Sequence, residues 1–478
     1  MSTKKRTTYP QLFGYGVGAI GLDLSYGLFF SILSFYLTDT LFFNASFLLV
    51  LLVSARIFDA FNDPFMGALV DKTKSRFGKY RPWMMGGAIA NAIVLVFLFS
   101  NPWGTVTPGV RNMALVVYII VLYFLWDITD TLMDIPYWSI VPSLESDPKR
   151  RNIAASVPRA FSGLGQVIIV VATPLMVPFL GGQDDMRQNP VGFQRWVFIC
   201  ALALIAFVFI SFVATGKIKS VAQTTPAKDK ITLRGVYNTL RQNDQLLVFM
   251  LVALLANAGW YLVTSLQPFF FSHVMEDTRL MALFGALVGG GMAVGLGILP
   301  VLTRWLARNT VIKVSMVMAI VGYVGMYIFG SVVYVFPLFI AFGLIGAMGV
   351  SCCFVSQTVM LSDVVDYGEY KLGKRNESTV FSMRCFLQKG AYTLQTIIMF
   401  SGLHFTGYRG YLDVQPAVAI QGISVMMFLV PPALVAIALT IFSRKYKLNE
   451  AKMEEVQSAI ASKKSAPGIG SAPLISES

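Results

Sequence analysis

Acidic side chains recur at helical spacing inside a hydrophobic stretch, Met113 to Val141, that is long enough to cross a bilayer. One face of this helix collects polar groups: Asp127, Asp130 or Thr131, Asp134 and Trp138. A carboxylate at bilayer depth costs about 2.5–3.5 kcal/mol on insertion scales, so such residues face a bundle interior or a water-filled cavity. Pro136 cannot donate to the carbonyl of Leu132, which predicts a bend and a free backbone acceptor. The stretch is therefore predicted to line a cavity for a polar substrate.

A second acidic group lies in the apolar run 44–70. Asp59 and Asp63 are one helical turn apart, and Asn62 is next to them. Such oxygen atoms suit a hard monovalent cation, or a proton shared between two acids whose repulsion raises one pKa. The alternative is structural: Asp59 pairs with Arg56 and Asp63 caps a kink.

Isolated charges recur in other apolar runs: Asp23, Arg159, Arg384 and Lys389. Arg159 is expected to neutralise Asp23 or Asp134 when no substrate is bound, or to form a purely structural ion pair. Trp138 lies one turn from Asp134, and a flat ring beside carboxylates suits the apolar face of a sugar. The alternative for Trp138 is a membrane-interface role.

The composition defines the broad class. The chain has 478 residues, of which 55% are hydrophobic and 13% are charged, and its mean hydropathy is positive. These values indicate a polytopic membrane protein. The net charge of +13 invites a nucleic-acid interpretation, but the basic residues gather in alternate loops between apolar runs, so no nucleic-acid partner is expected.

Twelve apolar runs are long enough to span a membrane: 11–38, 44–70, 82–101, 112–141, 154–180, 193–215, 246–272, 280–303, 310–330, 334–362, 377–402 and 418–442. With the amino terminus in the cytoplasm, the inner segments carry the basic clusters at 4–6, 72–81, 149–151 and 371–375. This bias predicts that both termini are cytoplasmic. A multi-pass protein of the cytoplasmic (inner) membrane follows, with its excess charge at an anionic leaflet.

The polar segment from Lys217 to Asp244 divides the apolar runs into two sets of six. The predicted domains are an N-terminal six-helix half (1–215), a cytoplasmic middle loop (216–244), a C-terminal six-helix half (245–443) and a cytoplasmic tail (444–478). Two such halves are typical of transporters built from repeats. No catalytic domain is appended, and a monomer is expected.

Other classes of function fit the residues less well. A membrane-embedded enzyme needs a nucleophile or a metal site, yet the two histidines, His273 and His404, lie at predicted outer-loop edges without Cys/His ligand spacing. No cofactor is therefore expected. A lipid transporter or a non-transporting sugar sensor on the same fold remains the alternative. A sensor should lack the acid pair and carry a large output domain.

Several ordered motifs point to a known family: Tyr15-Gly16 with Asp23, then 59–64, 71–79, 133–139, Pro158-Arg159, 243–246 and 363–369. Over nearly its full length the chain resembles the glycoside-pentoside-hexuronide:cation symporters of the major facilitator superfamily. Within that family it is most similar to the melibiose permeases and the lactose-type galactoside carriers. The resemblance implies an all-α membrane protein with twelve transmembrane helices in two six-helix halves.

The resemblance also implies site residues. It implies sugar contacts at Asp23, Asp134, Trp138 and Arg159. It implies a cation site, for Na⁺, at Asp59, Asp63 and Thr131, with Asn62 and Lys389 close by. Asp127 and Asp130 are acids where the melibiose permeases have none, whereas Arg384 is shared with the lactose-type carriers. The expected function is import of a galactoside-like di- or oligosaccharide coupled to Na⁺, Li⁺ or H⁺ by alternating access.

Charged residues at the predicted inner ends suggest a cytoplasmic gate. The loop from Gly67 through Arg81, which contains Asp71 and Arg76, is expected to latch the outward-facing state by ion pairs with neighbouring helix ends, unless its charge serves topology alone. Asp363 and Asp366 are expected to form a corresponding latch. Their candidate partners are Lys371, Lys374, Arg375 and Arg76.

Overall fold

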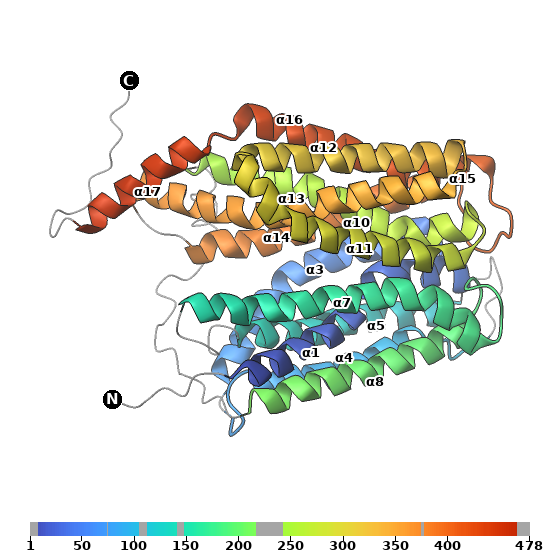
Figure 1. The fold of residues 1–478 in the computed structure, drawn as a ribbon. Helices are drawn as coiled ribbons and strands as arrows, with labels where there is room; N and C mark the ends of the chain where they lie inside the picture. The colour runs from blue at the N-terminus through green and yellow to red at the C-terminus, as the bar shows by residue number, and fades with distance from the viewer. Residues whose placement is uncertain are drawn as a thin grey trace. The chain divides into compact units, whose positions relative to one another are not determined.

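A computed structural model describes residues 8–73, 75–104, 112–140, 148–216, 242–373 and 377–465 (Figure 1). Every regular element in these ranges is a helix, which confirms the all-α prediction. The first part of the chain forms α1 (Tyr9–Gly27), η1 (Leu28–Ile32), α2 (Leu33–Phe35), η2 (Tyr36–Thr40), α3 (Ala45–Lys72), α4 (Arg81–Leu98), α5 (Met113–Ser139), α7 (Pro148–Gly181) and α8 (Pro190–Ala214). The rest forms α10 (Asp244–His273), α11 (Thr278–Trp305), α12 (Arg308–Tyr327), η3 (Ile328–Val332), α13 (Phe336–Leu372), α14 (Glu377–Phe405), α15 (Ala417–Phe428), α16 (Val430–Lys445) and α17 (Glu450–Ser465).

Ten helical segments among the described residues are long and apolar enough to cross a membrane. α3 and α14 occupy the predicted second and eleventh spans but are not among the ten. α3 contains the charged residues Arg56, Asp59 and Asp63, which lower its hydropathy. The full set of twelve spans and the cytoplasmic position of both termini stay predictions.

Asparagine caps fix where three helices begin. Asn44, Asn112 and Asn189 precede α3, α5 and α8, and each side-chain oxygen accepts a hydrogen bond from a backbone N–H of the first turn. A cap of this kind satisfies a donor that would otherwise have no partner in the helix. The caps on α3 and α5 therefore help to set the start of the two helices that carry the acidic residues.

The chain divides into two compact units. Unit 1 comprises Met1–Pro226, Ser265–Ala286 and Phe400–Ile420, and unit 2 comprises Ala227–Thr264, Leu287–Met399 and Gln421–Ser478. This division follows spatial contacts and does not test the two predicted six-helix halves. The acidic residues of α1, α3 and α5 all belong to unit 1.

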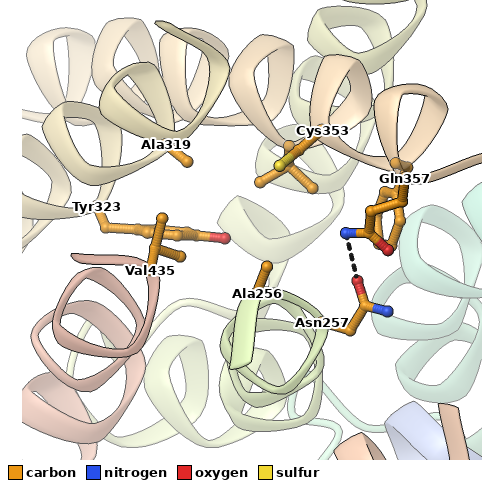
Figure 2. Close-up of a pocket in the computed structure, with 9 residues that line it drawn as sticks. Ala256, Asn257, Ala319, Tyr323, Cys353, Gln357 and Val435 are labelled. Atoms are coloured by element: carbon orange, nitrogen blue, oxygen red, sulfur yellow. Dashed lines mark hydrogen bonds between the residues drawn. The ribbon is translucent and has the colours of Figure 1, made fainter. Parts of the chain in front are cut away.

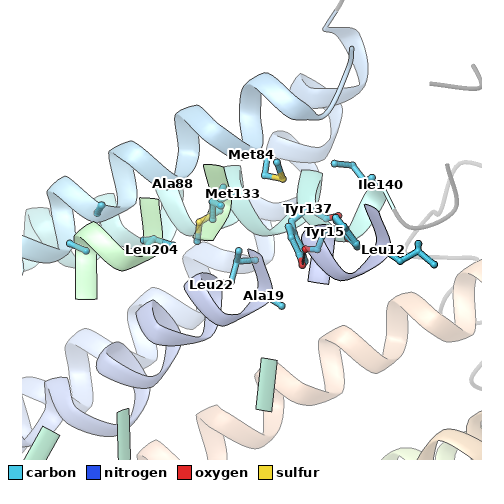
Figure 3. Close-up of a cluster of buried hydrophobic side chains, with 13 residues drawn as sticks. Leu12, Tyr15, Ala19, Leu22, Met84, Ala88, Met133, Tyr137, Ile140 and Leu204 are labelled. Carbon is cyan, nitrogen blue, oxygen red and sulfur yellow. Dashed lines mark hydrogen bonds between the residues drawn. The ribbon is translucent and has the colours of Figure 1, made fainter. Parts of the chain in front are cut away.

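A buried cluster in unit 1 fixes α1 against α5 (Figure 3). Tyr15 and Tyr137 are wholly buried, and their rings stack with centroids 4.7 Å apart. The Tyr15 hydroxyl donates to the Tyr137 carbonyl at 2.6 Å, and the Tyr137 hydroxyl donates to the Tyr15 carbonyl at 2.8 Å. On the other side of α5, a Cβ added to Gly87 of α4 would lie 2.8 Å from the backbone nitrogen of Met133. The segment of α5 that precedes Trp138 is therefore held tightly by two neighbours.

Unit 2 has its own packing. Tyr261 of α10 stacks on Tyr392 of α14 with ring centroids 3.8 Å apart. α12 and α13 approach closely where Gly322 faces Gly346, because an added Cβ at Gly322 would meet the Gly346 backbone.

Candidate substrate and cation site

Thr131 joins α3 and α5 at the centre of the candidate site. Its hydroxyl accepts a hydrogen bond from the Asn62 amide at 3.1 Å and lies 3.3 Å from Asp63 Oδ1. The same hydroxyl lies 2.9 Å from the carbonyl oxygen of Asp127 in its own helix. Because a hydroxyl has one proton, it can donate to only one of these two acceptors at a time. Three of the predicted cation residues thus form one oxygen-rich group.

Asp59, the fourth predicted cation residue, makes different contacts. Its Oδ2 lies 2.6 Å from Nη1 of Arg56, and the two side chains are 2% and 9% exposed. Arg56 also donates to the Tyr123 hydroxyl at 3.3 Å, and its guanidinium lies 5.3 Å from the centroid of the Phe30 ring. The alternative pairing of Asp59 with Arg56 is therefore present. Within the predicted sodium set, Asp63 lies 3.3 Å from the Thr131 hydroxyl, and Asp59 contacts Arg56.

Asp127 completes the group around Asp59, and we call Arg56, Asp59, Tyr123 and Asp127 the Asp127 cluster. The Asp127 carboxyl group lies near Asp59 and Arg56. Asp127 is 4% exposed, and its Oδ2 has no hydrogen-bond partner among the described residues. A buried oxygen in this state is uncommon in folded proteins and calls for a physical explanation.

The predicted sugar residues of α5, Asp134 and Trp138, lie about one and two turns beyond Thr131. Trp138 Nε1 donates to Asp134 Oδ1 at 2.8 Å, and both side chains are partly exposed. The guanidinium of Arg159, from α7, lies 6.0 Å from the centroid of the Trp138 ring. An aromatic face, a carboxylate and a guanidinium thus adjoin one another. Groups of these types can stack on a sugar ring and hydrogen-bond its hydroxyls.

Asp23 is placed by close packing of α1 against α7. A Cβ added to Gly165 would lie 2.7 Å from the Ile20 carbonyl and 2.8 Å from the Asp23 Cβ. Asp23 accepts a hydrogen bond from the Gln166 amide at 3.4 Å and interacts with the Ser162 hydroxyl. Its side chain is partly exposed. Neutral hydrogen-bond donors from α7 therefore hold the Asp23 side chain in place.

The other candidate residues are less fully defined. Asp130 is 6% exposed and lies on the same helix as Asp127. Lys389 is partly exposed on α14 in unit 2, and the side chain of Arg384 lies outside the described residues.

A pocket in unit 2 contains polar groups that the sequence analysis did not single out (Figure 2). There the Gln357 amide donates to the Asn257 side-chain oxygen at 3.1 Å.

The predicted gate residues have local contacts. The side chain of Asp71 lies outside the described residues, and the Arg76 guanidinium lies 4.7 Å from the centroid of the neighbouring Phe77 ring. Nη1 of Arg308 donates to both oxygens of Asp363 at 3.0 Å. Asp366 is partly exposed.

Arg308 is a partner for Asp363 that the sequence analysis did not name. The Arg308 side chain reaches Asp363 from the start of α12, whereas Lys371, an expected partner two turns farther along α13, pairs with Asp244 at 2.8 Å. The expected partners Lys374 and Arg375 lie outside the described residues.

The sequence analysis did not identify Asp39, which is another buried acid. Asp39, in η2, is fully buried and accepts hydrogen bonds from Thr38 at 2.6 Å, from Tyr408 at 2.6 and 2.8 Å, and from His273 at 2.6 Å. We call these four residues the Asp39 cluster, and all of them belong to unit 1. The loop that carries Tyr408 approaches closely, because a Cβ added to Gly410 would overlap the Thr38 carbonyl. A usable signal was the position of Asp39 one residue beyond the predicted first span.

Comparisons with known proteins identify the family of this chain. A family model described as MFS/sugar transport protein matches residues 14–450. The lactose permease of Lactobacillus delbrueckii subsp. bulgaricus is 27% identical over 92% of this chain and 71% of its own length. The isoprimeverose transporter of Lactiplantibacillus pentosus is 29% identical over 81% of this chain and 78% of its own length. The inner membrane symporter YicJ of Escherichia coli is 26% identical over 94% of both chains.

A solved structure extends the likeness of fold. A mutant form of the nucleoside transporter NupG superposes with a TM-score of 0.66 over 92% of this chain and 100% of its own, at 13% identity. At that identity the likeness concerns the fold alone. The family match covers most of the chain, from the first helix to the start of α17. The chain therefore belongs to the sugar transport proteins of the major facilitator superfamily, which are transporters and not enzymes.

Proposed function

We propose that this protein is a secondary active symporter that imports a glycoside together with a monovalent cation by alternating access. The substrate class is a galactoside-like di- or oligosaccharide, in keeping with relatives named for lactose and raffinose. The proposal includes twelve membrane spans, cytoplasmic termini and an inner-membrane location. It is in keeping with the relative named as an inner membrane symporter.

One observation carries the proposal: the candidate cation and sugar groups are joined through a single helix. Thr131 of α5 contacts Asn62 and lies near Asp63 of α3, and Asp134 and Trp138 follow on the same helix within two turns. When a cation neutralises an acid of α3, there is less negative charge near the protein carboxylates that contact the sugar. Sugar binding is therefore expected to tighten. Linkage requires the sugar to tighten cation binding by the same factor.

The driving force is sufficient for accumulation. One elementary charge that moves through 100 mV releases about 2.3 kcal/mol. At about 1.36 kcal/mol per factor of ten, this supports accumulation of the sugar by about fifty-fold. A carrier with this coupling needs no cofactor.

Uptake assays in cells that lack other sugar carriers test the proposal. Asp59→Cys or Asp63→Cys is expected to abolish cation-dependent accumulation of lactose, raffinose or isoprimeverose while sugar exchange or binding remains measurable. Normal uphill uptake in either variant would contradict the assignment of these acids to coupling. The panel is offered with sodium, with lithium or with protons alone, so that it also identifies the sugar.

A further inference from the structure

The Asp39 cluster joins segments that are far apart in the sequence, and the proposed sugar and cation contacts do not use it. Asp39 lies next to the last residue of η2, His273 is the last residue of α10, and Tyr408 lies three residues beyond α14. All three residues belong to unit 1, although most of α10 and most of α14 belong to unit 2. The cluster therefore ties the predicted N-terminal half of the chain to two segments of the predicted C-terminal half.

The three segments end on the same side of the membrane in the predicted topology. Asp39, His273 and Tyr408 follow or close the first, seventh and eleventh predicted spans, and odd-numbered spans cross the membrane in the same direction. With the amino terminus in the cytoplasm, as proposed above, this is the side from which the sugar is taken up.

Burial and short hydrogen bonds make the cluster a tight link. The exposed fractions of Asp39, His273 and Tyr408 are 0%, 4% and 7%, and Asp39 accepts from the other two residues at 2.6 Å. Hydrogen bonds to a carboxylate are strong, and more so where water is excluded. Asp39 lies in the π-helical turn η2, and π-helical turns are rare and occur frequently at functional sites.

Other contacts around the cluster join the same segments. The rings of Phe35 from α2 and Phe269 from α10 meet edge to face with centroids 5.3 Å apart, and both side chains are wholly buried. Phe269 also packs on the Tyr408 ring at 5.6 Å. At the end of α14, His404 Nδ1 lies 2.8 Å from the Ser46 hydroxyl of α3. Side chains from both predicted halves thus shield the cluster from water.

From these contacts we infer that the Asp39 cluster is the gate that closes the uptake side of the carrier. The inference rests on the proposed alternating access and names a part of it. A path for sugar from that side cannot form while the end of α10 and the loop after α14 are held to the end of the first span. The gate therefore breaks when the uptake side opens and forms again before the sugar leaves into the cytoplasm. Loss of one gate contact is expected to shift the population toward the open state.

Thiol labelling at the cluster tests the inference. Ser272 is 3% exposed, and its hydroxyl has no hydrogen-bond partner among the described residues, so Ser272→Cys introduces a thiol without loss of a contact. A membrane-impermeant maleimide is added on the uptake side of full-length protein in proteoliposomes, and the chain without Ser272→Cys gives the baseline from native cysteines. Tyr408→Phe is expected to raise the labelling rate of the introduced thiol at least about tenfold, because the closed state loses a hydrogen bond to a charged group.

Two controls separate opening of the gate from loss of the hydroxyl alone and from general loosening. Tyr411→Phe removes a hydroxyl from the same loop, but that hydroxyl accepts from Arg409. Tyr411→Phe is therefore expected to leave the labelling rate unchanged. Ser315 of α12 is 1% exposed and lies in unit 2. A thiol introduced by Ser315→Cys is expected to stay unlabelled in Tyr408→Phe.

Transport kinetics provide a readout that a purely structural role would not move. Tyr408→Phe is expected to lower both KM on the uptake side and the maximal rate of uphill uptake for whichever of lactose, raffinose and isoprimeverose the carrier accepts. The open state binds sugar from that side, so a larger open population tightens apparent binding, whereas release into the cytoplasm needs the closed gate. A variant that is only less stable would lose maximal rate with an unchanged KM.

Each outcome supports or overturns the gate. Equal labelling of the introduced thiol in Tyr408→Phe and in the unmodified background would overturn it, and so would labelling that rises equally at Ser315→Cys. If Tyr408→Phe does not fold, Asp39→Asn, which keeps the shape of the side chain, is expected to raise labelling in the same direction, and an unchanged rate would overturn the gate. The labelling needs neither sugar nor cation. Gate opening without ion-dependent uptake would therefore overturn only the proposed symport, and coupled uptake with unchanged labelling would overturn only the gate.

Discussion

Asp39 and Asp127 are acidic residues with nearly the same burial. They differ in how many hydrogen-bond donors surround their carboxyl groups. Asp39 is 0% exposed and accepts from Thr38, Tyr408 and His273. Asp127 is 4% exposed, yet one of its oxygens has no donor among the described residues. Burial alone therefore does not determine how well a carboxylate is stabilised. The supply of donors does, because an ionised carboxylate needs several of them once water is removed.

The Asp39 cluster draws its hydrogen-bond donors from three segments of the chain. Burial and the nearby Asp39 carboxylate raise the pKa of Tyr408 well above its usual value, so the Tyr408 hydroxyl stays a donor at physiological pH. The cluster ties the end of the first span to the end of α10 and to the loop after α14. We therefore expect the Asp39 cluster to stabilise the fold, and we expect Asp127 to act in transport. Four predictions test this contrast.

The largest effect is expected at Asp39. Asp39→Ala removes the carboxylate that Thr38, Tyr408 and His273 share as an acceptor, and removal of one member of a buried charged group costs about 3–5 kcal/mol. Thermal unfolding of the purified protein in detergent measures the loss as a lower transition temperature. Asp185→Ala is the control, since the Asp185 side chain is 40% exposed in its pair with Arg187, and loss of an exposed pair costs about 0–1 kcal/mol. Equal transition temperatures for the two variants would contradict the structural role of Asp39.

The next effect concerns two acids that are partly exposed. Asp23→Asn and Asp134→Asn are each expected to weaken sugar binding at least about tenfold, because a charge-assisted hydrogen bond contributes about 1.5–3 kcal/mol. Equilibrium binding of the transported sugar measures the change, and thermal unfolding verifies that each variant is folded. Unchanged sugar affinity together with lost stability would assign both acids to structure.

A smaller effect is expected when only one donor of the Asp39 cluster is removed. Tyr408→Phe keeps the ring that packs on Phe269 and removes the hydroxyl, so it should cost about 1.5 kcal/mol of stability. Asp39 still accepts from Thr38 and His273 in this variant. The unfolding assay used for Asp39→Ala measures both. A loss as large as that of Asp39→Ala would show that Tyr408 acts through more than this hydrogen bond.

The smallest change in stability is expected at Asp127. If Asp127 is a neutral carboxyl, Asp127→Asn exchanges one neutral group for another of similar shape and should alter stability by less than about 1 kcal/mol. Coupled uptake should nevertheless be lost, which separates ion transport from folding. Destabilisation similar to that of Asp39→Ala would indicate that Asp127 is ionised and supports the fold.

Much of the architecture follows from the sequence, because length and hydropathy determine which segments can enter a membrane. The helical spacing of Thr131, Asp134 and Trp138 also predicts a polar face on α5, and the structure gives these residues partners on neighbouring helices or within α5. The resemblance to a family groups Asn62 and Asp63 with Thr131. These features depend on local periodicity or on motifs that are short in sequence.

Other features depend on side-chain geometry across distant segments. The Asp39 cluster joins residues that are 234 and 369 positions apart, so no local pattern reveals it. The choice of Asp59 between Arg56 and the group at Thr131 is a choice between rotamers, which spacing on one helix cannot decide. Arg308 reaches Asp363 from a separate helix for the same reason.

Infrared spectroscopy tests the central contrast most directly, because a protonated carboxyl group has its own carbonyl stretching band. Spectra of the purified protein at neutral pH are compared for the unmodified chain, Asp127→Asn and Asp39→Asn. We predict a band of a buried protonated carboxyl that disappears in Asp127→Asn and persists in Asp39→Asn. A band that survives in Asp127→Asn, or that is lost in Asp39→Asn instead, would contradict a neutral carboxyl group at Asp127.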